Sequence, residues 1–243
     1  MHLFWRFGRF RHYRWLGRGV DATQLAAIRS EILGSPWMAA SNLNHRFRGT
    51  YGFTVAFQRH HLPALLQQFP TWGPVLEKML RPECNAFFLN PLLMKDGAGV
   101  APHVDLSLSS TVPGVRTPRY VSVLYVEVPP LLQGGLLRLY EGDSRVATIT
   151  PRAGTMLIFR GDMRHEVTPV TAGATDMYEA RLSLVVEQYR LTEHQLNYLP
   201  EIRIGTRRET EHPEAPLSGG AGEGLFGDEV RRWLGPSDER GVV

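Results

Sequence analysis

The chain has 243 residues, of which 43% are hydrophobic and 21% charged, and its formal net charge is +3 at pH 7. These fractions are typical of a soluble globular protein that is large enough to bury a core. The single cysteine, Cys84, excludes an internal disulfide and a cysteine-rich zinc site, so we expect a reducing, cytoplasmic location. No segment approaches the roughly 20 consecutive apolar residues of a membrane span, and no membrane partner is expected.

The beginning of the chain combines arginines with aromatic residues and has no acidic residue before Asp21. Such a pattern can contact phosphates or stack on bases. We interpret it instead as an aromatic packing segment with solvated arginines, because a net charge of +3 is small for a dedicated nucleic-acid binder. A nucleic-acid partner is therefore not expected. The arginines concerned are Arg6, Arg9, Arg11, Arg14 and Arg18.

Two helical stretches are predicted in the first third of the chain. Asp21 is an N-cap candidate, and apolar residues follow it at helical spacing as far as Gly34. A second stretch covers about 60–81 and is interrupted at Pro70. The connection around Asn42–Phe57 is expected to be rich in loops. Residues 1–82 are therefore predicted to form an N-terminal helical extension.

After Pro82 the pattern changes to short strand-like runs separated by Gly, Pro and Asp. Many short strands within about 110 residues favour a mainly β fold of the jelly-roll kind for residues 83–191. Residues 192–243 are expected to be a partly disordered C-terminal extension with a short helix at Asp228–Leu234. The runs cover about 84–94, 98–105, 119–128, 134–141, 145–149, 154–160, 164–170 and 179–190.

Three residues form a candidate metal site. His103 and Asp105 are two positions apart at the end of a strand-like run, so their side chains point to the same face. His165 opens a later strand that a rolled antiparallel sheet can bring beside them. Two histidines and one carboxylate leave three coordination positions open, which suits an iron(II) site that admits a co-substrate and dioxygen.

Arg181 and Ser183 also share one face of a strand, and the apolar residues around them predict that this strand is buried. A guanidinium pairs bidentately with a carboxylate, and a serine hydroxyl adds a further hydrogen bond. A buried arginine requires an anion, and the far carboxylate of 2-oxoglutarate would supply it.

Taken in order, these motifs resemble those of the 2-oxoglutarate/iron(II) oxygenase superfamily, and most closely its prolyl hydroxylase branch. The resemblance covers about residues 84–190. The segments that carry it are His103–Asp105, Tyr120–Tyr125, Gly134–Tyr140, Pro151–Phe159, His165–Val170 and Arg181–Ser183.

The resemblance implies an eight-stranded double-stranded β-helix, with the N-terminal helices packed on its major sheet. It implies that His103, Asp105 and His165 hold Fe(II) and that Arg181 anchors 2-oxoglutarate, with Tyr125 as a further contact or, equally, a core tyrosine. The implied reaction consumes dioxygen and 2-oxoglutarate, hydroxylates an unactivated C–H bond, and releases succinate and carbon dioxide. Ascorbate is implied as a reductant. A peptidyl proline, a free amino acid and a small molecule are all compatible substrates.

Two alternatives remain open at this point. A cupin-like hydrolase or isomerase would use the same three metal ligands with zinc or manganese, and would leave Arg181 and Ser183 unexplained. A non-enzymatic nucleic-acid-binding protein would rely on the basic beginning of the chain. The segment Leu106–Pro118 follows Asp105 and is rich in Ser, Thr, Pro and Gly, so we expect a mobile loop at the mouth of the site, with Arg119 near the entrance.

Overall fold

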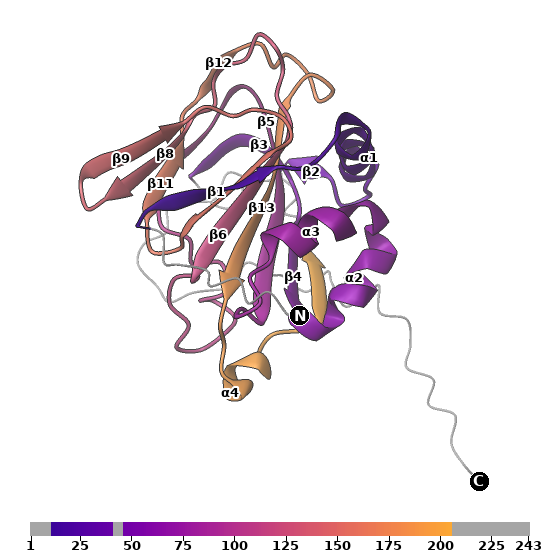
Figure 1. Ribbon diagram of the computed structural model, residues 1–243, viewed down its shortest axis with the longest axis vertical. Coiled ribbons are helices and arrows are strands. Elements are labelled where there is room, and N and C mark those ends of the chain that lie inside the picture. Colours follow the sequence, from indigo (N-terminus) through magenta and orange to yellow (C-terminus); the bar gives the residue numbers. More distant parts are fainter. Residues whose placement is uncertain (1–10, 41–45, 206–243) are drawn as a thin grey trace, which may run out of the picture.

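The computed structural model describes residues 11–40 and 46–205. Antiparallel strands make up most of it and curl into one strongly bent sheet, and the longer helices lie together on one side of this sheet (Figure 1). This is the jelly-roll type of architecture expected from the sequence. In the described part of the chain, no helix is both long and apolar enough to cross a membrane.

The helices before the sheet begin and end where the sequence predicts. The side chain of Asp21 accepts a hydrogen bond from the backbone N–H of Gln24, and Gly34 ends the first helix. A turn that begins at Pro70 interrupts the second helical stretch as predicted. The helices are α1 (Ala22–Leu33), η1 (Arg59–His61), α2 (Leu62–Gln68), η2 (Pro70–Trp72), α3 (Gly73–Met79) and, after the sheet, α4 (Glu193–Leu196).

The strands follow the predicted runs closely from residue 86 onward, although the runs at 84–94 and 98–105 form a single strand. They are β1 (Tyr13–Arg18), β2 (Ala39–Ala40), β3 (Phe47–Gly52), β4 (Thr54–Gln58), β5 (Ala86–His103), β6 (Tyr120–Glu127), β7 (Gln133–Gly134), β8 (Leu137–Glu141), β9 (Ser144–Ile149), β10 (Thr155–Arg160), β11 (Arg164–Val167), β12 (Val170–Ala172), β13 (Arg181–Tyr189) and β14 (Ile202–Gly205).

Strand β5 connects the two halves of the curled sheet. The strand order is β1-β10-β6-β13-β5-β11-β8-β9, and every pairing is antiparallel. The first half of β5 pairs with β13, whereas its last residues pair with β11. One strand therefore carries side chains into both walls of the interior.

Alternation along β13 divides the molecule into an outer and an inner layer. Leu182, Leu184 and Val186 pack with the buried residues of α1 and α3 in one core cluster. Arg181 and Ser183 lie on the opposite face, inside the curl. The helices thus cover the outside of the sheet, and the inside is left for a cavity.

The expectation of a loop-rich connection around Asn42–Phe57 is wrong over most of its length, because β3 and β4 form there and pair with β5. Gly52, at the end of β3, permits a close approach of two backbones. Its φ of 157° is one that L side chains rarely adopt, and a Cβ at this position would lie 2.0 Å from the carbonyl oxygen of Pro91. The N-terminal region is therefore a mixture of helices and strands.

The structure describes only part of the two terminal segments for which we stated expectations from the sequence. Residues 11–18, which we interpreted as an aromatic packing segment, include strand β1, which pairs with β10 at the edge of the sheet. Arg6, Arg9 and the predicted helix at Asp228–Leu234 lie outside the described residues.

Candidate active site

The three candidate metal ligands meet inside the curl of the sheet. His103 ends β5, His165 lies in β11, and the two residues are directly paired across the strands. Asp105 follows β5 by two residues. Its carboxylate oxygens lie 3.2 Å from Nε2 of His103 and 3.5 Å from Nε2 of His165. One ligand atom from each residue lies within 4.8 Å of the others, which is the arrangement that a single metal ion requires.

Backbone carbonyl groups orient both imidazole rings. Nδ1 of His103 lies 2.9 Å from the carbonyl oxygen of Ala101, and Nδ1 of His165 lies 3.1 Å from that of Met163. A proton on Nδ1 donates to each carbonyl, so the lone pair of each Nε2 is directed toward Asp105. The edges of Phe47 and Phe159 pack against the two rings.

Burial and mutual charge shift the pKa values of this cluster. Burial lowers the pKa of His165 and outweighs the attraction of Asp105. Burial also acts to lower the pKa of His103, but the hydrogen bond and charge of Asp105 outweigh it and the pKa is raised. The two histidines hold the pKa of Asp105 below its usual value, although burial opposes this. A metal requires neutral histidines and an ionised carboxylate, and the shifts at His165 and Asp105 favour these forms.

The cluster borders a cavity of about 170 Å³ that Arg181, Ser183 and Tyr125 also line. Ser183 is paired with Tyr125 across β13 and β6, and the guanidinium of Arg181 lies 5.2 Å from the centre of the Tyr125 ring. Arg181 is only 2% exposed. The structure therefore brings together all six residues that the sequence singled out.

Unpartnered polar atoms in this cavity test whether the residues fit an anionic co-substrate. Within the described residues, Nε of Arg181, the hydroxyls of Tyr125 and Ser183, and one oxygen of Asp105 are buried without a hydrogen-bond partner. Burial lowers the pKa of Arg181, and no carboxylate of the described residues offsets this. Such a group is costly unless an anion pairs with it, so the cavity fits a carboxylate ligand at Arg181.

Glu187 is a cavity residue that the sequence analysis missed. Its carboxylate accepts hydrogen bonds from the hydroxyl and backbone N–H of Ser107 and from the hydroxyl of Tyr189. Burial and the charge of Asp105 raise the pKa of Glu187 to about 8. The signal was present in the sequence, because Arg181, Ser183 and Glu187 all lie at even spacing on one strand.

The loop after Asp105 differs from the expectation. Leu106 and Ser107 line the cavity, but Leu108 and Val112 are buried in a core cluster with Tyr189, which anchors the loop to the fold. The predicted mobile loop is therefore fixed at its centre.

The position of Arg119 differs from the expectation that it lies near the entrance of the site. Arg119 does not line this cavity and faces a separate hollow on the outside. Asn90 is a polar residue that does line the cavity, whereas Asn85 bonds to the backbone of Leu191.

A jelly roll with a buried His-x-Asp…His cluster inside its curl defines a class of metal-dependent β-proteins. Residues 89–186 match the family model of the 2OG-Fe(II) oxygenase superfamily. This match covers less than half of the chain and agrees with the resemblance to that superfamily predicted from the sequence. The cofactors that the family implies are iron(II) and 2-oxoglutarate.

Other comparisons give more distant similarity. The chain is 28% identical over 115 residues to a lipoyl synthase of Nitrosococcus oceani, and this match spans 46% of the chain but only 35% of that relative. A prolyl-4-hydroxylase from Pseudomonas putida has a TM-score of 0.49 at 19% identity, covering 74% of this chain and 93% of the other. A prolyl hydroxylase from Trichoplax adhaerens, solved with a peptide fragment, has a TM-score of 0.47 at 16% identity, covering 76% and 86%.

Proposed function

We propose that the protein is an Fe(II)- and 2-oxoglutarate-dependent dioxygenase that hydroxylates an unactivated C–H bond of a peptidyl-prolyl, amino-acid or small-molecule substrate. His103, Asp105 and His165 hold the iron. Arg181 binds the far carboxylate of 2-oxoglutarate, and Ser183 and Tyr125 complete its binding site. The observation that carries the proposal is the buried, anion-free guanidinium of Arg181 in the same cavity as the metal cluster.

The set of three metal ligands supports iron chemistry because it leaves coordination positions unfilled. His103 at the end of β5, Asp105 two residues later and His165 on β11 would supply three ligands to an ion and would leave further coordination positions for other molecules. Iron(II) and 2-oxoglutarate, once bound, supply the oxidation: dioxygen is consumed, one oxygen atom enters the substrate, and the other enters succinate as carbon dioxide is lost.

The protein's own residues position the reactants and exclude water. Arg181 offers a planar fork that pairs bidentately with a carboxylate. The hydroxyls of Ser183 and Tyr125 are free to donate to the same group. Apolar side chains, among them Val123, Leu137 and Val167, form much of the remaining wall and keep the cavity dry.

This arrangement separates the proposal from a cupin-like hydrolase or isomerase. Such an enzyme needs the metal ligands alone, and would leave a buried guanidinium uncompensated at a cost of several kcal/mol. In the proposed oxygenase, the far carboxylate of 2-oxoglutarate pairs with that charge.

The proposal is tested by anaerobic titration of the protein with Fe(II) and 2-oxoglutarate, followed by exposure to air with candidate substrates. We expect one iron per chain, succinate release, and a mass gain of one oxygen in the substrate. His103→Ala and His165→Ala should each remove the stoichiometric iron while the far-UV circular dichroism stays unchanged. His194→Ala is the matched control, because this exposed histidine lies in α4, away from the cavity.

Iron retained by both ligand variants would contradict the ligand assignment. Iron binding without any 2-oxoglutarate binding would contradict the co-substrate assignment and favour the cupin-like alternative.

A further inference from the structure

Glu187 is a buried polar residue of the cavity that the proposed reaction does not use. It lies on the inner face of β13, six residues after Arg181, and is 5% exposed. Six residues of a strand span about 20 Å, so Glu187 occupies the opposite end of the cavity from the anion site. It is paired there with Phe88 of β5 and Val121 of β6, which also line the cavity.

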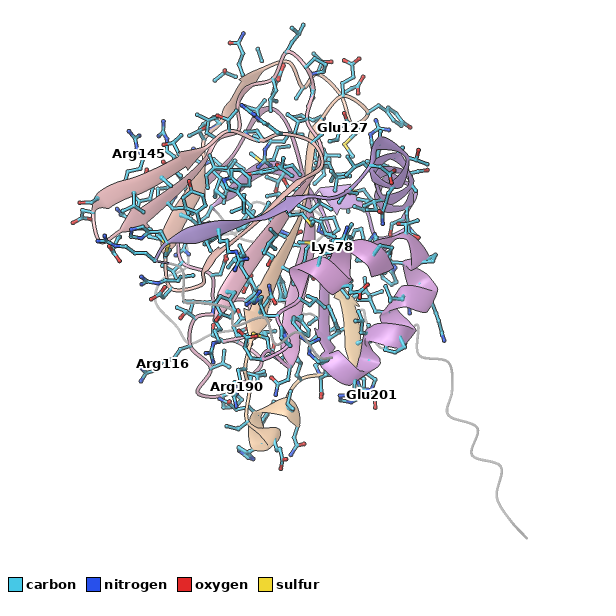
Figure 2. All side chains as sticks on the ribbon, viewed as in Figure 1. Lys78, Arg116, Glu127, Arg145, Arg190 and Glu201 are labelled. Carbon is cyan, nitrogen blue, oxygen red and sulfur yellow. The ribbon has the colours of Figure 1, made fainter. Side chains whose placement is uncertain are left out.

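The loop Leu106–Pro118 folds against this end of β13. Figure 2 shows Arg116, from the loop, and Arg190, which follows β13 directly, at the same end of the molecule. Just after the loop, the backbone N–H of Arg119 donates to the carbonyl of Gln188 at 2.8 Å. Loop and strand are therefore in direct contact at this end of the cavity.

Glu187 holds Ser107 of this loop at two points. One carboxyl oxygen, Oε1, accepts a hydrogen bond from the hydroxyl of Ser107, and the other, Oε2, accepts one from its backbone N–H at 3.3 Å. The hydroxyl of Tyr189 also donates to Oε2. Tyr189 is buried in one core cluster with Leu108, so the carboxyl group is fixed between the loop and the core.

The side chain of Asp105 has no comparable support of its own. A backbone carbonyl orients each imidazole, of His103 and His165, whereas among the described residues one oxygen of the Asp105 carboxylate finds no hydrogen-bond partner. Residues 104–106 belong to no helix or strand, so no sheet pairing holds the backbone of Asp105. It lies two residues after His103, which is paired across the sheet, and two residues before Ser107. Two residues of chain reach about 7 Å at most, so the position of Ser107 limits where the carboxylate can point.

We propose that Glu187 is a positioning residue that fixes the Asp105 carboxylate at the metal site through Ser107. This role rests on the proposed metal site and deepens it, because it gives the third ligand an outer support like the one that backbone carbonyls give the two histidines. Removal of such outer partners typically costs about 10- to 100-fold in metal affinity.

The test is the affinity of the full chain for Fe(II), measured without oxygen or 2-oxoglutarate by competition with a chromogenic chelator. Glu187→Ala should weaken Fe(II) binding about 10- to 100-fold. Glu187→Gln keeps an oxygen acceptor for Ser107 and should restore the affinity to within about threefold of the wild type. Ser107→Ala removes the hydroxyl but keeps the backbone N–H, so it should cause a smaller loss and add nothing to that of Glu187→Ala in the double variant.

Gln188→Ala is the matched control for a purely structural effect. Gln188 is the next residue of β13, is buried on the outer face, and forms hydrogen bonds with the backbone of Met79 and Arg81 and with the hydroxyl of Ser122. Its truncation should lower the melting temperature about as much as Glu187→Ala does, yet change the Fe(II) affinity less than about twofold. The visible absorption of bound Co(II), which reports ligand geometry, should change in Glu187→Ala and not in Gln188→Ala. Affinities are compared at a temperature at which circular dichroism shows the variants to be folded.

Wild-type Fe(II) affinity in Glu187→Ala would overturn this positioning role and leave the ligand assignment standing, because the wild type still binds the metal. Equal weakening by Gln188→Ala would reduce Glu187 to a structural role and overturn the proposal as well. A wild-type chain that binds no Fe(II) would remove the metal site itself, and the positioning role with it. If Glu187→Ala does not fold, Ser107→Ala decides, and an unchanged affinity and Co(II) spectrum in that variant would contradict the proposal.

Discussion

The guanidinium of Arg181 carries a charge that burial destabilises. A bound ligand is needed to compensate this charge. Arg181→Ala should weaken 2-oxoglutarate binding at least tenfold, because loss of a charge-assisted bidentate pair costs about 2–5 kcal/mol. Calorimetric titration of the iron-loaded protein measures this effect. The same substitution removes an unpaired buried charge, so the ligand-free protein should melt at an equal or higher temperature.

Arg138→Ala is the control for this substitution, since Arg138 is partly buried but pairs with Glu166 at 3.2 Å on the outer side. It should leave 2-oxoglutarate affinity unchanged. An Arg181→Ala protein with wild-type affinity would move the anchor to another residue.

Cys84 is the single thiol of the chain and is 1% exposed. Burial, followed by the charge of Glu83, raises its pKa to about 12. Since the thiolate is the reactive form, the folded protein should react with iodoacetamide at pH 8 far more slowly than the unfolded protein does. Mass spectrometry of samples quenched over time, with and without denaturant, measures the two rates. Equal rates would mean that the core around Cys84 opens readily.

At the scale of elements, the turn between β7 and β8 supports the anion site. Gly135 has φ of 63°, and a Cβ there would lie 2.9 Å from Cδ of Arg181. Gly135→Ala should therefore displace the guanidinium and raise the KM for 2-oxoglutarate several-fold while iron binding is retained. Gly142→Ala is the matched control, because Gly142 also has positive φ (59°) but a Cβ there would meet no atom within 4 Å. Equal effects of the two substitutions on KM would show that backbone strain, and not displacement of Arg181, is responsible.

The sequence predicts elements well where the pattern is local. The cap at Asp21, the break at Pro70 and the runs that became β6, β10 and β13 depend on neighbouring residues only. Strands β3 and β4 were missed because their stability comes from pairing with β5, which is remote in sequence. Tertiary pairing of this kind overrides local turn signals.

Strand alternation predicts those residues of the candidate site that lie on the same face of one strand. Alternation grouped Arg181 with Ser183, and the same rule extended by four residues would have included Glu187. No local rule would have included Arg46, which lines the cavity, because it precedes a strand whose pairing the sequence did not reveal.

For the whole molecule, Glu187 gives the metal-free protein a pH-dependent stability. Its pKa is about 8 in the folded state, against an ordinary value of 4.5, so the folded state retains a proton that the unfolded state has released. The free energy of unfolding should therefore fall as the pH rises from about 4.5 to 8. Glu187→Gln removes this proton linkage and should flatten the profile. Urea denaturation in EDTA at pH 6 and pH 9 measures the difference.

Glu166→Gln serves as the comparison, since Glu166 is also a strand glutamate but pairs with Arg138 away from the cavity. A decline of equal steepness in the wild type and in Glu187→Gln would assign the pH dependence to other groups.

The distribution of charge is also a property of the whole fold. The formal charge of +3 is a sum over the chain and contains no positions. Folding gathers arginines from six separate positions around one hollow.

Because β5 pairs with both β13 and β11, its length should be constrained more tightly than that of other segments. Met94 lies opposite Arg181, and His103 lies opposite His165, on a single continuous strand. Adding or removing one residue between them would turn either the histidine or the wall of the anion site to the wrong face. Insertions and deletions should be excluded from this stretch, yet be tolerated at the exposed turn between β8 and β9 around Gly142 and Asp143, where no paired face has to be kept.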